Sequence, residues 1–397
     1  MSRYHSYINN ALKVIETFKG ERPFAVFIKQ FFAANKKYGS KDRKKIAALC
    51  YNYFRMGFAG SNLAPDQKLL LATFLCETEP SQLLEKLQPE WNNLVSLPLQ
   101  EKLALVQTQF SLFDIFPFSD ELSEGIDLAI FAASLLKQPD LFIRIRPKAK
   151  AVVLKKLQKS NLPFQLINGD CVQFAMSANL EDYFEIDKEV VVQDYNSQKV
   201  LDYLKHNSLY FDKIKDKPNE NLSVWDCCAA SGGKSILLTD TLGQKFDLTV
   251  SDIRAGIVLN LHQRFKKADI KEYKYFIADI GNNDLKQVAT DVDLIICDAP
   301  CSGSGTWSRT PEQLCFFKKQ SIQEYSMLQK KIVSNVLPHL RTGGLFIYIT
   351  CSVFKDENEK IAEFIASDCN GKLLQQQLLT GYEQKADSMF VAVFEKL

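Results

Sequence analysis

The pattern of apolar and polar positions changes twice along the chain. Up to about residue 136, apolar residues recur at spacings of three and four, which indicates amphipathic helices. The clearest helical segments are residues 11–18, 24–35, 41–56, 67–77 and 80–87. This part of the chain is therefore predicted to be a small helical bundle, with Ser40 as the N-cap of the segment that begins at residue 41.

The pattern is mixed between residues 139 and 215. Leu141–Arg146 alternates apolar and basic residues, as expected for a strand with one solvated face. Residues 151–159 have a basic helical pattern, and a second helix is expected to open within Gln193–Gln198. Further short strands are expected at 164–167, 171–174 and 189–193. We interpret this segment as a small α+β module whose exposed face is basic.

From residue 222 onward, short β-branched runs alternate with helical patterns. Strands are expected at 222–227, 246–251 and 273–278, in a run that ends at Asp298 and in a run that ends at Cys351. The last two runs flank a helical pattern over about 320–338. Strand, helix, strand order predicts parallel neighbours, and hence a doubly wound α/β sheet. The predicted domains are 1–138, 139–215 and 216–397.

Composition narrows the class of protein. The chain has 397 residues, of which 46% are hydrophobic and 24% charged, as in ordinary soluble globular proteins. It has no run long enough to span a membrane and no signal-peptide core at its start, so no membrane partner and a cytoplasmic location are expected. Its ten cysteines suggest a reducing compartment. None has C-x-x-C spacing and the four histidines are scattered, so no metal is expected.

The net charge of +2 hides a local asymmetry. Residues 1–60 contain twelve Lys and Arg residues against three acids, and residues 141–165 contain seven against none. Clustered positive charge with interleaved aromatic residues is what binding to a phosphate backbone needs. Runs of charge are also common on solvated faces, so charge alone leaves nucleic-acid binding open.

Two cysteines follow strands that are predicted to be neighbours. Cys301 comes three residues after Asp298, in a turn rich in Gly and Ser, and Cys351 comes directly after an apolar run. The carboxyl ends of parallel strands meet at one edge of the sheet, where open α/β sheets bind ligands. A single cysteine after a strand is most often a packing residue, as is expected for Cys227, Cys228 and Cys297. Two cysteines at equivalent ends of neighbouring strands, beside an acidic residue, indicate a reactive site.

A turn of small residues follows the first strand of the predicted sheet. Small residues in Cys228–Lys234 let a ligand approach the backbone, and the following helix offers unpaired N–H groups. Asp252, about twenty residues further on, is placed to accept a ribose hydroxyl, and Asp279 and Asp298 end two more strands. Three strand-end acids around one turn indicate a cofactor that contains a nucleoside. The turn lacks the ATP-binding and dinucleotide-binding glycine patterns.

These elements suit methyl transfer to carbon 5 of cytosine, if the cofactor is S-adenosyl-L-methionine. Carbon 5 is a poor nucleophile until a thiolate adds to carbon 6, which splits one difficult step into easier ones. An acid that hydrogen-bonds the pyrimidine edge would stabilise the developing charge, and Asp298 is placed for this. A second thiol could assist the final elimination. From the residues alone, either cysteine could be the one that attacks.

The chain resembles the bacterial Sun/Fmu (RsmB-type) RNA cytosine-C5 methyltransferases over nearly its whole length. The resemblance rests on Asp226–Lys234, Asp298–Gly303, Tyr348–Ser352 followed by Glu357-Asn-Glu359, and more weakly on Gln193–Gln198 and Arg309–Glu312. It implies a Rossmann-like S-adenosylmethionine-dependent methyltransferase domain. An all-α NusB-like RNA-binding domain and a small α+β RNA-recognition module would precede this domain.

The resemblance also implies roles for single residues. Cys351 would be the nucleophile that attacks carbon 6, and Cys301 would help to release the product. Asp298 would lie between cofactor and base, Asp252 would hold the ribose, and Asp279 the adenine. The methionine part of the cofactor would contact Cys228, Ala229, Ala230, Ser231, Gly232, Gly233 and Lys234. Ser231 stands where the family usually has proline, which would fix φ in the turn.

We therefore expect an S-adenosylmethionine-dependent RNA (cytosine-5)-methyltransferase that acts on small-subunit rRNA through a covalent intermediate between cysteine and carbon 6. The alternatives are a tRNA cytosine-5 methyltransferase and a non-catalytic RNA-binding factor of ribosome assembly. The presence of Cys351, Cys301 and Asp298 together argues against the non-catalytic alternative. The modified cytosine and the oligomeric state are left open.

Overall fold

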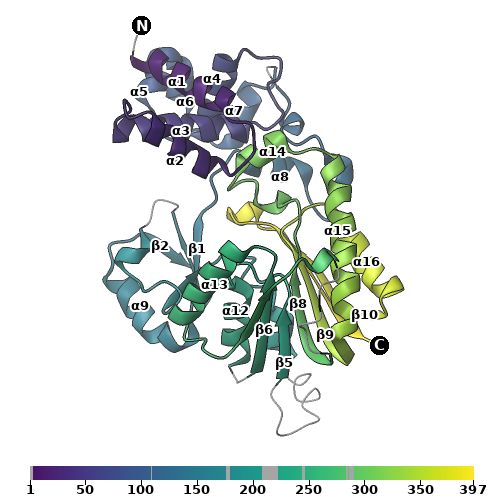
Figure 1. Cartoon of the computed structure of the whole chain (residues 1–397). Helices are drawn as coiled ribbons and strands as arrows, with labels where there is room; N and C mark the ends of the chain where they lie inside the picture. The colour runs from purple at the N-terminus through teal and green to yellow at the C-terminus, as the bar shows by residue number, and fades with distance from the viewer. Residues whose placement is uncertain are drawn as a thin grey trace. The chain divides into compact units, whose positions relative to one another are not determined.

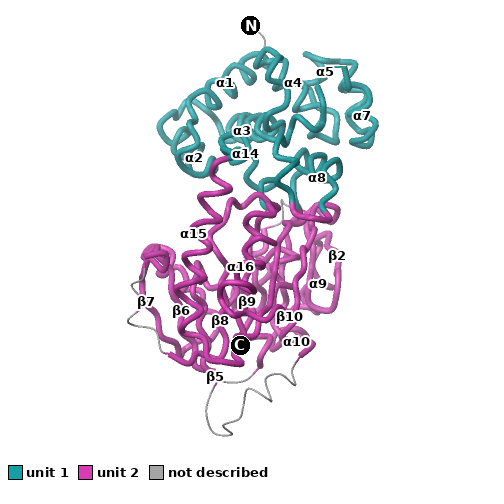
Figure 2. The backbone as a smooth tube through the Cα atoms, turned by 90° about the vertical axis from the view of Figure 1, so that its right-hand side faces the viewer, with its two compact units in different colours: residues 1–122, 126–139, 306–319 teal, residues 123–125, 140–305, 320–397 magenta. Residues whose placement is uncertain are grey.

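The computed structural model describes residues 3–108, 110–175, 179–207, 222–243, 246–282, 285 and 290–397. The chain divides into two compact units, which Figure 2 colours separately. Unit 1 comprises residues 1–122, 126–139 and 306–319. Unit 2 comprises residues 123–125, 140–305 and 320–397. The predicted three-domain division stays a prediction, and its boundary at 215/216 lies outside the described residues.

Unit 1 is all-helical, as predicted. Its helices are α1 (Arg3–Thr17), α2 (Phe24–Ala34), α3 (Ser40–Arg55), α4 (Pro65–Cys76), α5 (Gln82–Leu87), α6 (Pro89–Leu94), α7 (Leu99–Leu105), α8 (Leu128–Leu135) and α14 (Pro311–Phe316). The predicted N-cap at Ser40 is wrong, because α3 begins at Ser40 and its N-cap position is Gly39. The rings of Phe18 and Phe54 both pack edge-on against Phe24 in the core, with centroids 5.1 and 4.9 Å away.

The segment 306–319, which comes from the C-terminal half of the sequence, is part of this helical unit. The buried carboxylate of Glu312 accepts a hydrogen bond from the backbone N–H of Phe24 at 3.1 Å. Arg55, also buried, donates to the carbonyl oxygen of Ser308 at 2.9 Å. The segment is therefore held by buried polar contacts that local sequence patterns do not reveal.

The first part of unit 2 is a small α+β module. Its sheet has the order β2-β3-β1-β4, formed by β1 (Leu141–Ile145), β2 (Phe164–Leu166), β3 (Cys171–Phe174) and β4 (Val190–Val192), with antiparallel pairing throughout. Helix α9 (Lys150–Lys159) follows β1. The helix predicted to open within Gln193–Gln198 is wrong, because residues 195–201 form turns and α10 (Asp202–His206) begins later.

The rest of unit 2 is a seven-stranded sheet of order β10-β11-β9-β8-β5-β6-β7 (Figure 1). Its strands are β5 (Leu222–Asp226), β6 (Phe246–Asp252), β7 (Lys274–Ile277), β8 (Val292–Asp298), β9 (Leu340–Thr350), β10 (Gly371–Leu379) and β11 (Met389–Lys396). The five strands from β5 to β9 pair in parallel, which confirms the predicted α/β sheet. The antiparallel pair of β10 and β11 at one edge was not predicted.

Helices cover both faces of this sheet because its central strands are apolar on both sides. Alternate residues of β8 point to opposite faces of the sheet and enter two different cores. On one face, Leu294 and Ile296 pack with α12 (Gly233–Leu242) and α13 (Ala255–Lys267). Ile295 and Cys297 pack with α15 (Gln320–Val336) and α16 (Glu359–Asp368). The chain runs outward from β5 in one direction through β6 and β7, and then returns to β8 and β9 on the other side. The topological switch point lies between β5 and β8, where such sheets bind ligands.

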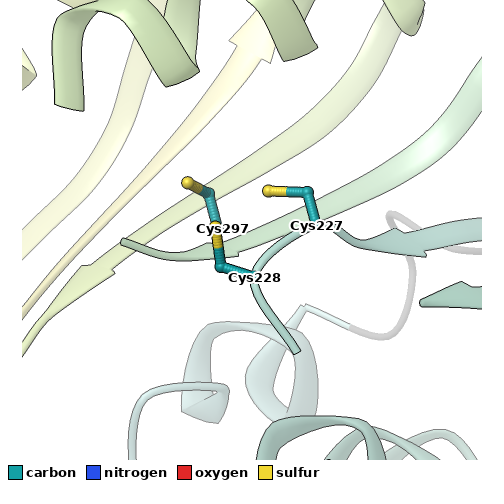
Figure 3. A group of neighbouring side chains, drawn as sticks. All are labelled: Cys227, Cys228 and Cys297. Carbon is teal, nitrogen blue, oxygen red and sulfur yellow. The ribbon is translucent and has the colours of Figure 1, made fainter. Parts of the chain in front are cut away.

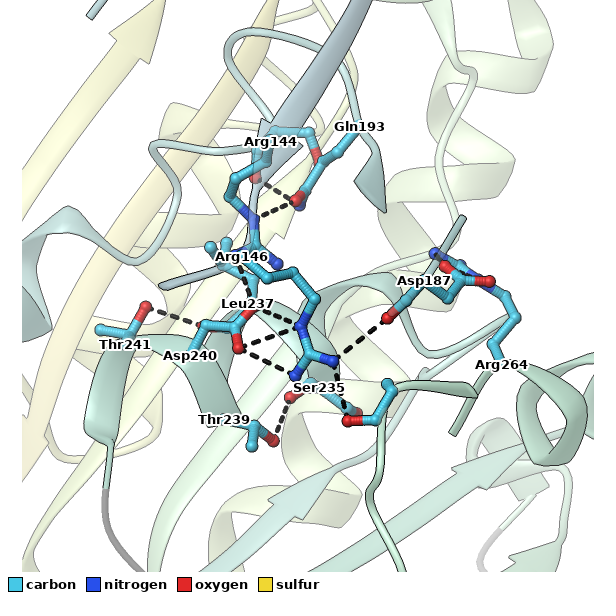
Figure 4. A network of polar contacts seen from close by, with 12 residues as sticks. Arg144, Arg146, Asp187, Gln193, Ser235, Leu237, Thr239, Asp240, Thr241 and Arg264 are labelled. Atoms are coloured by element: carbon cyan, nitrogen blue, oxygen red, sulfur yellow. Dashed lines mark hydrogen bonds and ion pairs between the residues drawn. The ribbon is translucent and has the colours of Figure 1, made fainter. Parts of the chain in front are cut away.

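The α+β module is fixed to the larger sheet through Asp240 on α12 (Figure 4). The carboxylate of Asp240 accepts hydrogen bonds from Arg144 Nη1 at 2.6 Å and from Arg146 Nη2 at 2.9 Å. The side chains of Arg144 and Arg146 are only 6% and 11% exposed. The prediction of a basic exposed face is therefore wrong for these two residues, which are mostly buried and pair with Asp240.

Two more basic residues of the same stretch pair with acids of the module. Lys150 lies 2.8 Å from Asp170, and Lys156 lies 2.6 Å from Glu189. Much of the positive charge in residues 141–165 is thus balanced locally, which weakens its case as a phosphate-binding surface. No helix in the described parts of the chain is both long and apolar enough to cross a membrane.

Candidate active site

The two cysteines predicted to act together meet at the carboxyl ends of β8 and β9. These strands pair in parallel with Asp298 opposite Ile349, so the loops that follow them start side by side. Cys301 lies in the loop after β8, and Cys351 directly follows β9. Their Sγ atoms are 3.4 Å apart, which confirms the predicted proximity of the two thiols.

The two sulfurs are not equivalent. Hydrogen bonding with Cys351, followed by burial, raises the pKa of Cys301 well above its ordinary value. Cys301 is therefore held as a thiol, which can donate its proton to the sulfur of Cys351. The thiolate is the nucleophilic form of cysteine, so a raised pKa disfavours Cys301 as the attacking sulfur.

The loops that carry the cysteines are joined by a buried polar network. The carboxylate of Glu357 accepts hydrogen bonds from the backbone N–H of Ser302 and from the hydroxyl of Ser352, both at 2.8 Å. Gln329 on α15 donates to the same carboxylate at 3.1 Å. Burial raises the pKa of Glu357. Because Ser302 follows Cys301 and Ser352 follows Cys351, one carboxylate fixes both loops.

Asn358 holds the two residues that flank Cys351. Its side-chain oxygen accepts from the hydroxyl of Thr350 at 2.6 Å, and its side-chain amide donates to the carbonyl oxygen of Ser352 at 2.9 Å. The positioning roles of Glu357 and Asn358 were missed at the level of sequence. The signal that could have found them is the Glu-Asn-Glu motif at 357–359, which served only as a mark of resemblance.

Gly305 allows close backbone contact beneath Cys351. Its N–H donates to the carbonyl oxygen of Cys351 at 2.8 Å, and a Cβ atom at this position would lie 2.1 Å from the carbonyl oxygen of Ser388. Gly305→Ala should therefore displace the Cys351 loop and lower the free energy of unfolding by about 1–3 kcal/mol. Urea unfolding and the rate of alkylation of Cys351 by iodoacetamide would measure both effects. Gly256→Ala on α13 is the control, since nothing lies within 4 Å of its added Cβ. Equal behaviour of the two variants would contradict the close-contact explanation.

A cavity of about 610 Å³ opens beside the two thiols at the switch point of the sheet. Its volume falls in the range of small-molecule sites. The predicted strand-end acids Asp252, Asp279 and Asp298 all line it, together with Cys301 and Cys351. From the turn after β5, Cys227, Cys228 and Ala230 line the cavity. The other predicted cofactor contacts, Ala229, Ser231, Gly232, Gly233 and Lys234, are not among its lining residues.

The turn itself needs its small residues. Gly232 has φ of +81°, and a Cβ there would lie 2.4 Å from Cε1 of Phe265. Ser231, the departure from the family's usual proline, accepts a hydrogen bond from Arg264 Nη1 at 2.9 Å through its hydroxyl oxygen. Arg264 also pairs with Asp187 of the α+β module at 2.8 Å. The serine thus replaces the rigidity of a proline ring with a polar link that holds the turn.

The acids of the cavity have partners within the chain. Asp252 accepts hydrogen bonds from the backbone N–H of Ala230 at 3.0 Å and of Arg254 at 2.9 Å, so it links the turn to the end of β6. Asp298 pairs with Lys234 Nζ at 2.8 Å. Burial opposes the charge of Lys234, but the carboxylate of Asp298, through its charge and its hydrogen bond, outweighs burial and raises the pKa of Lys234. A protonated lysine therefore lies within electrostatic range of Cys351.

The acid-ended strands and the cavity at the switch point define a Rossmann-like methyltransferase fold. The protein PH0851 has a TM-score of 0.70 to this chain at 17% identity, covering all of both chains. A methyltransferase homologue from Pyrococcus horikoshii has a TM-score of 0.58 at 18% identity, covering 74% of this chain and 97% of its own. These likenesses show the fold.

A family model matches the C-terminal part of the sequence. Residues 214–394 are similar to the model of 16S rRNA methyltransferase RsmB/F, which agrees with the predicted Sun/Fmu resemblance over this part of the chain. Ribosomal RNA small subunit methyltransferase B of Proteus mirabilis is 27% identical over 216 residues, covering 52% of this chain and 46% of that protein. The enzyme of the same name from Shewanella oneidensis is 32% identical over 157 residues, covering 39% and 36%. The chain thus aligns with less than half the length of these relatives.

Proposed function

We propose that the protein is an S-adenosylmethionine-dependent RNA (cytosine-5)-methyltransferase and that its substrate is small-subunit rRNA. The observation that carries the proposal is the pair of thiols, 3.4 Å apart, at the edge of a nucleoside-sized cavity. One thiol as nucleophile and one beside it is what addition to carbon 6 and later elimination require. The relatives named as small-subunit rRNA methyltransferases support the choice of RNA.

The residues of the cavity fit this cofactor. Asp252 and Asp279 are carboxylates at the ends of adjacent strands, suited to ribose and adenine, and the turn at Cys228 and Ala230 brings the backbone to the cavity wall. NSun6 from Pyrococcus horikoshii, a protein of similar fold, was solved with SFG, an analogue of S-adenosylmethionine. When bound, S-adenosylmethionine supplies the methyl group.

The chain's own residues would carry the other steps. The thiolate of Cys351 adds to carbon 6 of cytosine, stabilised before attack by the Cys301 thiol and by the charge of Lys234. Asp298, held by Lys234, hydrogen-bonds the pyrimidine edge, and the positive charge of Lys234 beside it stabilises the negative charge that develops on the ring. Carbon 5 then takes the methyl group. A base removes the carbon 5 proton, and the electron pair of that bond re-forms the double bond between carbons 5 and 6 as the sulfur–carbon bond breaks and the thiolate leaves. Cys301, next to the departing sulfur, assists this release. The target base must leave its stack to reach the thiol.

Unit 1 is the better candidate for contact with the RNA backbone. Its basic residues Lys36, Lys37, Lys41, Lys44 and Lys45, at the end of α2 and in the first half of α3, are all exposed. The basic stretch of the α+β module, in contrast, is largely paired with acids. Exposed lysines can neutralise phosphates and release counterions.

The test is incubation of the full chain with methyl-labelled S-adenosylmethionine and unmodified transcripts of 16S rRNA and tRNA, followed by digestion of the RNA to nucleosides. Label in 5-methylcytidine from the rRNA is the expected result. Label only in tRNA would mean that the protein carries out the same reaction on tRNA instead of rRNA. Cofactor binding without label in either RNA would favour a non-catalytic RNA-binding factor of ribosome assembly.

A further inference from the structure

Three further cysteines meet at the wall of the cavity, although two of them lie some seventy residues from the third. Cys227 and Cys228 follow β5, and Cys297 is the last residue but one of β8. Pairing of the two strands brings them together, since the N–H of Cys227 donates to the carbonyl oxygen of Ile296 at 2.9 Å. The three Sγ atoms all lie within 4.8 Å of one another (Figure 3). We call these residues the thiol cluster.

The spacing of the thiol cluster suits a single ion. A zinc–thiolate bond is about 2.3 Å long, so sulfurs around one ion lie roughly 3.8 Å apart in a tetrahedron and roughly 4 Å apart in a trigonal plane. Sulfurs within 4.8 Å of one another need only small side-chain shifts to reach these distances. Thiolates are soft ligands, which select Zn²⁺ and Cu⁺ over hard cations.

The surroundings of the thiol cluster provide a second observation. Asp226, the last residue of β5, is fully buried, and its Oδ1 has no hydrogen-bond partner among the described residues. Its carboxylate lies within electrostatic range of Cys228 and Cys297. A buried carboxylate oxygen without a partner is costly, and a cation nearby would offset that cost.

We propose that the thiol cluster binds one soft d¹⁰ cation, Zn²⁺ or Cu⁺, through Cys227, Cys228 and Cys297. Three sulfur–metal bonds form as the three thiols lose their protons to solvent. Cys227 and Cys297 are fully buried, whereas Cys228 is half-buried and lines the cavity. Three sulfurs complete the trigonal coordination of Cu⁺. Zn²⁺ takes a fourth ligand, and the open position would face the cavity on the side of Cys228.

The site has a consequence that rests on the proposed function. A cation held by Cys228 fixes one wall of the cavity. Because three protons leave as one Zn²⁺ or Cu⁺ binds, the site becomes more negative, which favours a positively charged sulfonium in the cavity. Cation and S-adenosylmethionine should therefore favour each other's binding, and by linkage each should raise the affinity of the other by the same factor. Cation binding itself needs neither RNA nor turnover, so it can be tested even if the reaction is a different one.

Cd²⁺ is the probe, because its bonds to thiolates give a charge-transfer band in the ultraviolet. The full chain, reduced and metal-free, would carry Cys301→Ala and Cys351→Ala so that the neighbouring thiol pair cannot bind the probe. We expect one Cd²⁺ per chain, displaced by Zn²⁺. Cys297→Ala in this background should lower the affinity by at least about 10²-fold. Cys297→Ser, which nearly keeps the volume of the side chain, serves if the alanine variant does not fold.

The controls separate the thiol cluster from cysteines in general. Cys50→Ala and Cys171→Ala each remove a single buried thiol outside the cluster and should leave the band unchanged. Competition with a Cu⁺ chelator tests the trigonal alternative in the same variants. Absence of a band together with no retention of Cu⁺ would overturn the proposal, as would a band that Cys297→Ala and Cys297→Ser leave intact. Cd²⁺ binding in this background, together with no methylation by the unaltered chain, would instead bear on the proposed function alone.

Discussion

Cys351→Ala is expected to abolish methylation, with a loss of at least about 10³-fold, and to form no covalent complex with RNA. The reason is that no other described sulfur lies at the end of β9, where the target base would meet the methyl donor. Cys301, which is 3.4 Å away, is held as a thiol by burial and by its hydrogen bond to Cys351, so it is a poor substitute. Methylation assays and denaturing gels of protein incubated with labelled RNA would measure both outcomes.

The partner variant should behave in the opposite way on the gel. Cys301→Ala keeps the nucleophile and removes the thiol beside the departing sulfur, so it should attack RNA and release it poorly. A protein–RNA adduct that survives denaturation is the expected result. Cys369→Ala, which removes a half-buried thiol at the end of α16, is the control and should match the unaltered protein. An adduct in Cys351→Ala and none in Cys301→Ala would mean that the two roles are reversed.

The parallel sheet could be predicted from the sequence because its signals are local. Each central strand is a short apolar run that ends in an acid or a cysteine, and the chemistry of Asp298, Cys301 and Cys351 follows from the parallel pairing of β8 and β9. The antiparallel strands β10 and β11 were missed. β10 is largely exposed and alternates little, so it shows no simple pattern. β11 begins with a buried apolar run, Met389–Phe394, so its signal was present in the sequence.

Burial of charge was harder to predict, because it depends on partners far away in sequence. The alternating pattern predicted that Arg144 and Arg146 lie on the solvent-exposed face of a strand. In the structure both pair with Asp240, some ninety residues later in the sequence. The thiol cluster was hidden in the same way, since Cys227 and Cys297 each look like ordinary packing residues until β5 and β8 pair. The positioning roles of Glu357 and Asn358 depend on hydrogen bonds to the loops that carry the two cysteines, and these contacts exist only in the folded chain.

The buried pairing at Asp240 predicts the second large effect. Asp240→Ala would leave two guanidinium groups without their carboxylate in an environment where their side chains are only 6% and 11% exposed. Burial already lowers the pKa of Arg144, and Asp240 offsets this. Removing one partner of a buried ion pair typically costs about 3–5 kcal/mol. We expect a loss of this size in the stability with which the α+β module is held to α12, measured by hydrogen exchange of the backbone amides in β1, β4 and α12.

A matched control distinguishes loss of the ion pairs from loss of any aspartate. Asp202 pairs with Lys205 at 2.7 Å on α10, but these side chains are 37% and 44% exposed. Pairs of this kind contribute about 0–1 kcal/mol, so Asp202→Ala should change exchange little. If the two variants lost the same protection, the guanidinium groups would be solvated by water in the folded chain. Selective loss in Asp240→Ala would show that Arg144 and Arg146 hold the module to the sheet, so their charge is engaged within the molecule.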